Sequence, residues 1–207
     1  MKKVALIGYS GHAFVVIDTF QQSGFEIAGY FERTISQNNP YHLDYLGFEQ
    51  NPEFVQTAKD YYLFPAIGDN NIRQKLIKLL IDNNLLIGTA IHPKANISKF
   101  SEINKGTLVC QGACINPFAK IGLGVIINTS AIIEHECIVG NYSHIAPGAV
   151  LAGNVTVGFN TFIGANSVIK QGVNIGNNVI IGAGSVVLND IPNDTKWIGN
   201  PAKISLT

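Results

Sequence analysis

The sequence predicts a small α/β domain followed by a parallel β-helix of hexapeptide repeats. Before residue 90, apolar segments of strand length alternate with segments of helical period. From Ile91 to Val187, an aliphatic residue recurs every six positions, and such a fixed period is the signature of a repeat architecture. We therefore divide the chain of 207 residues into a domain at 1–90 and a domain at 91–207.

The first 90 residues contain the elements of a Rossmann-like parallel sheet. VALIGYSGHAFVVIDTFQQSG predicts a strand, a glycine turn and a helix, and FEIAGYFE and YYLFPAIG predict two further strands. NNIRQKLIKLLIDNN predicts a second helix, so strands and helices alternate. Ligands of such sheets bind at the carboxyl ends of the strands. Those ends carry Gly8–His12, Glu32 and Gly68–Asn70.

The GYSGH turn favours an anion more than a dinucleotide. It lacks the full GxGxxG pattern, but the helix that follows offers its N-terminal amides to a negative charge. A glycine needed only for the tight turn is the alternative. The polar loop 34–52 is either a lid or variable surface.

The period of six predicts the shape of the second domain. Seventeen aliphatic residues follow one another at this spacing without an insertion. The spacing indicates short strands joined by two-residue corners, with alternate residues pointing inward. Three such hexapeptide units close one triangular coil. Asparagine and glycine are frequent at the corners because they tolerate positive φ.

The segment IIEHECIVG places a histidine at one of these corners. Ile133 and Cys137 fall on inward positions and Glu134 on an outward one, so His135 and Glu136 occupy the corner. We therefore expect the imidazole of His135 to face solvent. An imidazole changes protonation state near neutral pH, which suits a general base.

A second histidine lies half a coil away from the first. His144 precedes an inward residue and so points outward from the middle of a flat face, nine residues after His135. A side of the triangle spans about 15 Å, so these histidines can meet only where two β-helices pack side by side. Gly153 lies one coil after His135, and another edge carries a ladder of small residues: Pro147, Ala165 and Ala183.

That ladder predicts a ligand slot between subunits. If the His135 corner of one subunit faces Ala165 and Ala183 of its neighbour, a narrow slot with exposed backbone results. Such a slot suits a long, thin ligand whose amides need main-chain partners. Three-fold symmetry would give three equal slots.

Several segments resemble one family of bacterial sugar acetyltransferases. GYSGH, AIGDNNIRQKL, NTSAIIEHECIVGNYSHIAPGAVLAGNVTVG and IGNPAK resemble the bacillosamine N-acetyltransferase and sialic acid O-acetyltransferase family. The resemblance covers nearly the whole chain, and its specific part is the EHE block followed by SH. It implies a left-handed β-helix, against the usual right-handed crossover. It also implies a homotrimer, acetyl-CoA as co-substrate, and no metal.

The resemblance further implies a reaction and roles for individual residues. The acceptor would be a UDP-4-amino-4,6-dideoxy sugar, and His135 would be the base, oriented by Glu136 or Glu134. Contacts to acetyl-CoA would come from His144, Gly153, Ala165 and Ala183, and contacts to the nucleotide-sugar from Ser10, Gly11, His12, Glu32, Gly68 and Asn128. Where the bacillosamine enzymes carry paired aspartates after the second strand, this chain has Phe31 and Glu32.

Composition argues against other classes of partner and compartment. The formal net charge is zero, and no block of basic residues points to nucleic acid. Cys110, Cys114 and Cys137 form no CxxC pair, which fits a reducing cytosol. No segment reaches the roughly 18 apolar residues needed to span a membrane. We therefore expect a cytoplasmic protein.

Three alternatives to sugar N-acetylation stay open. One is O-acetylation of a sialic acid or a related sugar. Another is a sensor that binds a nucleotide-sugar without catalysis and would not bind acetyl-CoA. A β-helix carbonic anhydrase is the third, but it needs three converging histidines. The five histidines, at 12, 42, 92, 135 and 144, contain no close pair with ligand spacing.

Overall fold

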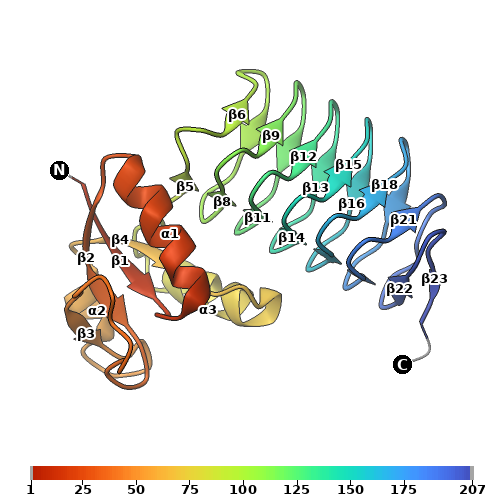
Figure 1. Ribbon diagram of the computed structural model, residues 1–207. Helices are drawn as coiled ribbons and strands as arrows, with labels where there is room; N and C mark the ends of the chain where they lie inside the picture. Colours follow the sequence, from red (N-terminus) through yellow and green to blue (C-terminus); the bar gives the residue numbers. More distant parts are fainter. Residues whose placement is uncertain (1, 206–207) are drawn as a thin grey trace. The chain divides into compact units, whose positions relative to one another are not determined.

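The chain folds into two compact units (Figure 1). The computed structural model describes residues 2–205. The first unit runs from residue 1 to Pro93, and the second begins at Lys94. No helix in the described part of the chain is long and apolar enough to cross a membrane.

The first unit is a four-stranded parallel sheet with helices, in agreement with the α/β prediction. Its strands are β1 (Lys3–Ile7), β2 (Glu26–Phe31), β3 (Tyr45–Gly47) and β4 (Tyr62–Pro65), in the order β3-β2-β1-β4. Its helices are α1 (Gly11–Gln22), α2 (Phe54–Ala58) and α3 (Asn70–Asp82). The sheet and helices bury apolar side chains such as Ile7, Phe31 and Leu80.

Two short elements in this unit were not predicted. β3 lies inside the polar loop 34–52 and extends the sheet at its edge, where the amide of Tyr30 donates to the carbonyl of Asp44. α2 follows the loop and packs Phe54 against Phe31, with ring centroids 5.0 Å apart. Strands of three residues and helices of five are too short to leave a periodic pattern in the sequence.

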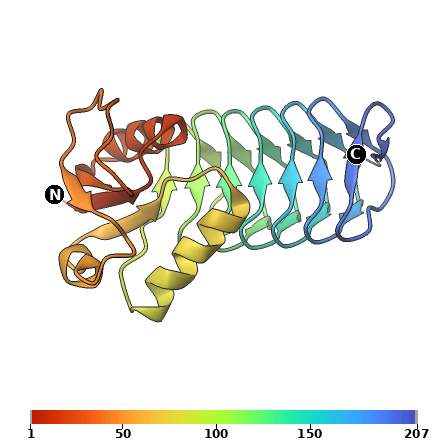
Figure 2. The same ribbon diagram turned by 90° about the horizontal axis from the view of Figure 1, so that it is seen from below.

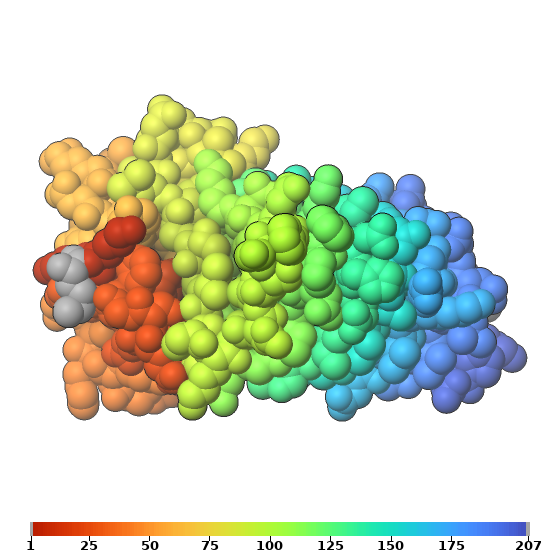
Figure 3. Space-filling view, turned by 90° about the horizontal axis from the view of Figure 1, so that it is seen from above, coloured from red at the N-terminus to blue at the C-terminus, as the bar shows by residue number. Residues whose placement is uncertain are grey.

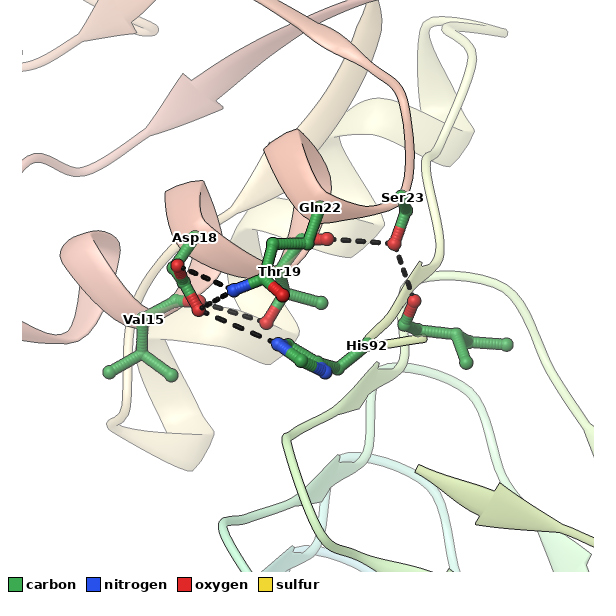
Figure 4. Close-up of polar contacts among 7 residues, drawn as sticks. Val15, Asp18, Thr19, Gln22, Ser23 and His92 are labelled. Carbon is green, nitrogen blue, oxygen red and sulfur yellow. Dashed lines mark hydrogen bonds and ion pairs between the residues drawn. The ribbon is translucent and has the colours of Figure 1, made fainter. Parts of the chain in front are cut away.

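The last segment of the first unit is attached to α1 by polar contacts (Figure 4). This segment contains β5 (Ala90–Ile91). The hydroxyl oxygen of Ser23 lies 2.6 Å from the carbonyl oxygen of Ile91. His92 is buried, and its Nε2 atom lies 3.6 Å from a carboxylate oxygen of Asp18. These contacts hold the chain against α1 where the unit ends.

The second unit is a left-handed parallel β-helix with three flat faces, as predicted (Figure 2). The first face contains β6 (Asn96–Ile97), β9 (Cys114–Ile115), β12 (Ile132–Ile133), β15 (Val150–Leu151), β18 (Val168–Ile169) and β21 (Val186–Val187). The second contains β7 (Glu102–Ile103), β10 (Lys120–Ile121), β13 (Ile138–Val139), β16 (Thr156–Val157) and β19 (Asn174–Ile175). The third contains β8 (Leu108–Val109), β11 (Ile126–Ile127), β14 (His144–Ile145), β17 (Phe162–Ile163), β20 (Ile180–Ile181), β22 (Lys196–Ile198) and β23 (Lys203–Ile204).

The register of these faces confirms that three hexapeptides make one coil. Ile132 pairs with Val150, and Ile138 pairs with Thr156, so each of these strands pairs with the third strand after it. From Val109 to Val187 the inward aliphatic column is buried, and inward hydroxyls donate to carbonyls of the next coil. Ser143 donates to Gly158 at 2.7 Å. Because the coils stack directly on one another, each coil contributes only a narrow band of surface, visible as successive colours in Figure 3.

The corners have a uniform backbone conformation. From Gly106 to Gly184, every sixth residue has a positive φ. Glycine, asparagine and serine fill nearly all of these positions, because a left-handed conformation is costly for residues with larger side chains. The exceptions are Phe118, Glu136 and Tyr142, with φ values of 66°, 61° and 61°.

Candidate active site

The first unit gathers its predicted ligand-binding residues at the carboxyl ends of β1, β2 and β4. The carboxylate of Glu32 accepts hydrogen bonds from the backbone amides of Tyr9 (3.2 Å) and Arg33 (3.0 Å). Glu32 therefore lies against the turn that contains Ser10 and Gly11. Ser10 is the N-cap residue of α1 and has an extended backbone. The backbone amides of the first helical turn follow directly.

His12 is the neutral histidine of this cluster. Burial disfavours its charged form and, together with the positive charge of Arg73, lowers its pKa from 6.5 to about 4. The ring lies beside Gly68, where an added Cβ atom would be 3.9 Å from Cγ of His12. Near neutral pH, His12 therefore presents an uncharged imidazole at the N-terminal end of α1.

Arg73 holds the residues around Gly68 and Asn70 in place, and the sequence analysis did not identify it. The side chain is 1% exposed. Its Nη1 donates to the carbonyls of Gly68 (3.0 Å) and Ile67 (3.3 Å), and its Nη2 donates to Oδ1 of Asn70 (2.7 Å). Burial lowers the pKa of its guanidinium to about 10. The available signal was its position on the buried face of α3, which it shares with Leu76, Ile77 and Leu80.

The second unit places His135 and Glu136 at an exposed corner. Their side chains are 50% and 61% exposed, and Nδ1 of His135 lies 3.0 Å from a carboxylate oxygen of Glu136. Because an ionised carboxylate can only accept a hydrogen bond, this contact assigns the ring proton to Nδ1. The lone pair of Nε2 is then available to accept a proton.

Gly153 supports the ring of His135 one coil further on. A Cβ atom at Gly153 would lie 2.5 Å from both Cε1 and Nε2 of His135, a distance that real Cβ atoms do not show. The imidazole therefore rests directly on the backbone of Gly153. Any larger residue there has to displace it.

His144 lies on the third face and is more buried than the repeat predicted. We expected an outward side chain on a flat face, but its exposed fraction is 7%. Its Nε2 lies 3.1 Å from the amide nitrogen of Asn128, and its ring packs edge-on against Phe162, with centroids 5.0 Å apart. Phe162 pairs with His144 one coil further on and covers its ring. The sequence analysis predicted the outward direction of His144 but not this cover.

Ala165 and Ala183 lie on a different edge from His135. The amide of Gly184 donates to the carbonyl of Ala165 at 2.8 Å. A Cβ atom at Gly164 would lie 2.5 Å from the amide nitrogen of Ala183. Successive coils approach closely at this edge, where Ala183 is exposed. The structure thus places the His135 corner on one edge of the β-helix and the alanine ladder on another, and the Asn128–His144 pair lies on the third face beside the ladder's edge.

Metal ligands do not cluster in the described chain. Within residues 2–205, no group of three or more histidine, cysteine, aspartate or glutamate side chains could hold a metal ion. Cys137 is buried in the core, and burial raises the pKa of its thiol. The side chains that could act in acid–base chemistry at this corner are therefore His135 and Glu136.

The lowered pKa of His12 predicts a dependence of stability on pH. The unfolded chain takes up this proton near pH 6.5, whereas the folded protein takes it up near pH 4. The contribution of neutral His12 is thus present above pH 6.5 and is lost as the pH falls to 4. The free energy of unfolding of the wild type should therefore fall as the pH is lowered. We expect this fall to be smaller in His12→Gln, by up to about 3 kcal/mol.

Urea unfolding at pH 7.5 and 4.5 measures this difference. His42→Asn is the matched control, because His42 is an exposed loop histidine whose φ of 52° asparagine tolerates. The control should keep the wild-type dependence on pH. An unchanged dependence in His12→Gln would contradict the buried, neutral state of His12.

Family models match both units of the chain. The PglD N-terminal domain matches residues 3–80. The bacterial transferase hexapeptide, a model of six repeats, matches residues 154–189. The first match lies within the α/β unit and the second within the repeat unit.

Solved structures match along the whole chain. The perosamine N-acetyltransferase from Caulobacter crescentus, solved as a histidine-to-asparagine variant with CoA and GDP-perosamine, is 35% identical, with a TM-score of 0.94 and coverage of 100% of this chain and 98% of that chain. The acetyltransferase domain of PglB from Neisseria gonorrhoeae FA1090, solved with acetyl coenzyme A, is 29% identical, with a TM-score of 0.92 and coverage of 99% of both chains. WeeI from Acinetobacter baumannii AYE, at 23% identity and a TM-score of 0.82, covering 99% of this chain and 100% of that chain, shows the shared fold.

These matches extend over both units and include a relative at 35% identity. The chain belongs to the acetyl-CoA-dependent N-acetyltransferases of nucleotide-linked amino sugars, which join a PglD-type N-terminal domain to hexapeptide repeats.

Proposed function

We propose that this protein acetylates the 4-amino group of a nucleotide-linked 4-amino-4,6-dideoxy sugar, with His135 as the general base. The observation that carries the proposal is the His135–Glu136 pair, held at 3.0 Å on an exposed corner over Gly153. The perosamine enzyme, which is 35% identical to this chain, was solved with CoA and GDP-perosamine after a histidine had been replaced by asparagine or by alanine.

The proposed reaction is a direct transfer without an acyl-enzyme. The sugar amine attacks the thioester carbonyl carbon while Nε2 of His135 removes a proton from the amine nitrogen. A carbon–nitrogen bond forms, and a backbone amide stabilises the oxyanion. Collapse of this intermediate breaks the carbon–sulfur bond, and His135 returns the proton to the departing thiolate of CoA. General base catalysis of this kind contributes about 10²–10⁴-fold to the rate.

Glu136 orients the base in this mechanism. Its carboxylate accepts the Nδ1 proton of His135, so Nε2 is kept as the acceptor. The negative charge also stabilises the imidazolium that forms during attack. Glu134, the alternative partner named by the sequence, precedes the corner on the outward side of the strand end.

The nucleotide contacts are assigned to the first unit. The diphosphate would bind at the N-terminal end of α1 near Ser10 and Gly11, beside the neutral ring of His12. Glu32 and Gly68, which lie against this turn, would contact the nucleoside. We expect UDP as the carrier, whereas the perosamine enzyme was solved with a GDP-linked sugar. Measuring CoA release with UDP-, GDP- and dTDP-linked amino sugars identifies the carrier.

The assembly that completes the site is proposed to be a homotrimer. The His135 corner and the Ala165–Ala183 edge lie at different edges of one β-helix, so only a neighbouring subunit can bring them together. Acetyl-CoA would lie between them, in contact with Gly153, Ala165, Ala183 and His144. Light scattering should therefore report a trimer. A monomer with full activity would contradict this arrangement.

Replacing the base should abolish most of the turnover. We expect His135→Ala to lower kcat by about 10²–10⁴-fold. Its melting temperature should stay near the wild-type value, because the residue is an exposed corner. Glu136→Gln should lower kcat less, since it acts through His135.

Glu134→Gln is the matched control for the carboxylate. It should leave kcat within a few-fold of the wild type if Glu136 orients the ring. A larger loss in Glu134→Gln than in Glu136→Gln would exchange the two roles. Activity of His135→Ala close to the wild-type value would refute the assignment of the base.

Separate substitutions should distinguish the two binding regions. We expect His12→Ala to raise KM for the nucleotide-sugar and to leave KM for acetyl-CoA nearly unchanged, as the loss of a remote binding contact does. Ala183→Trp should raise KM for acetyl-CoA, because the bulky ring covers backbone that is now exposed. If both substitutions affected acetyl-CoA alone, the first unit would not hold the acceptor.

A further inference from the structure

We propose that Phe118, supported by Phe100, forms the acceptor side of the active site and contacts the methyl group of a 6-deoxy sugar. This inference rests on the proposed function, because it takes His135 as the base. It assigns specificity for the acceptor sugar to a residue pair of the β-helix.

The backbone of Phe118 is the first observation. A bulky residue with positive φ is an outlier, and such outliers concentrate at functional sites. Among the three bulky corner residues, Glu136 is the proposed partner of the base. Tyr142 is buried, with its ring packed edge-on against Phe159, so burial offsets its strain. Phe118 has the same strain, with a φ of 66°, but its side chain is 61% exposed.

The position of Phe118 is the second observation. The amide of Glu136 donates to the carbonyl of Pro117, so Phe118 lies one coil before Glu136 on the same edge. Neighbouring strands are about 4.8 Å apart, which places Phe118 next to the catalytic pair. The amide of Phe118 in turn donates to the carbonyl of Phe100, one coil further back.

The two phenylalanine rings form a preorganised apolar surface. Their centroids are 5.8 Å apart, and their planes are inclined by 29°. The ammonium group of Lys99 lies 5.1 Å from the centroid of the Phe100 ring, and this cation–π contact helps to hold the ring in place. Phe100 is itself 57% exposed. The pair therefore presents a wide apolar surface on one side of His135.

Among the described residues, the side of His135 opposite Phe118 carries no aromatic surface. This difference indicates on which side the sugar and the thioester bind. Beyond the catalytic pair, the next coil places Gly153 and Asn154 on the same edge, and the coil after it places Gln171 and Gly172 there, so no aromatic side chain follows on this side. A narrow slot for the thioester fits this side. Since the amine has to attack the thioester carbonyl at His135, the acceptor sugar approaches from the other side, where Phe118 lies.

The chemistry of an aromatic surface selects a deoxy sugar. A methyl group at C6 packs against the ring, whereas a hydroxymethyl group brings a hydroxyl that the ring cannot hydrogen-bond. Apolar contacts of this kind discriminate by about 10–100-fold in kcat/KM. We expect the wild-type enzyme to prefer a nucleotide-linked 4-amino-4,6-dideoxy sugar over its 6-hydroxy counterpart by that factor.

The test compares both acceptors with three proteins: the wild type, Phe118→Asn and Leu188→Asn. Asparagine suits the positive φ, so relief of strain offsets the lost ring contact, and the melting temperature should stay within about 3 °C. Phe118→Asn should reduce the preference to within about 3-fold, with KM for acetyl-CoA unchanged within about 2-fold. Leu188 is an exposed aliphatic residue, 45% exposed and three coils after Glu134. Leu188→Asn should keep the full preference.

Three outcomes would overturn the inference while leaving the proposed function intact. The first is a wild type that acetylates both sugars equally, and the second is a Phe118→Asn variant that keeps the wild-type preference. The third is dissociation of the Phe118→Asn oligomer in light scattering, which would place the ring between subunits. A wild type that acetylates neither amino sugar would contradict the proposed function itself.

Discussion

The hydrogen bonds between successive coils are the interaction on which the second unit depends. Each coil donates amides to the carbonyls of the next one, and a strand pairs with the third strand after it. Neighbouring strands in such sheets are about 4.8 Å apart. Side chains at equivalent positions therefore lie in columns, and a residue contacts its counterparts in the coils on either side. The contacts of the His135 corner exist only within such a column.

The columns explain how a side chain at an exposed corner can keep one orientation. His135 lies on the edge of the β-helix, where side chains are normally free to move. Gly153, one coil further on, supports its ring, and Glu136 accepts its Nδ1 proton. The rotation of the imidazole is thus limited by backbone on one side and a carboxylate on the other. Rigid scaffolding of this kind is what a general base needs, because proton transfer depends on geometry before it depends on pKa.

The repeat made much of the second unit predictable from sequence. The period placed His135 and Glu136 at a corner and Cys137 in the core, because each slot of a hexapeptide has one environment. Contacts across columns were harder to predict. The burial of His144 depends on Phe162, and the period alone assigns both an outward direction. Local periodicity cannot state how large outward side chains cover one another.

The first unit was predictable to a smaller extent for a different reason. Its long elements have a helical or alternating pattern, whereas β3 is held by pairing with β2. Arg73 is buried because its guanidinium satisfies carbonyls at the turn after β4. A charged residue on a helix is normally exposed, so no local rule indicates this role. The cluster around His12 follows from a buried cation that only the tertiary structure reveals.

The triangular cross-section constrains the lengths of insertions more strictly for the proposed site than for the fold. Each hexapeptide turns the chain by one third of a coil, so inserting a single hexapeptide would preserve every inward and corner slot. The core would remain filled, and the ladder would simply be longer. All later corners, however, would move to the next edge, and Ala165 and Ala183 would leave the edge that they now occupy. Only the insertion of a whole coil, three hexapeptides in length, keeps each later corner on its own edge. The absence of any insertion between Ile91 and Val187 thus maintains the angular relation between the His135 corner, where we propose the base, and the alanine edge.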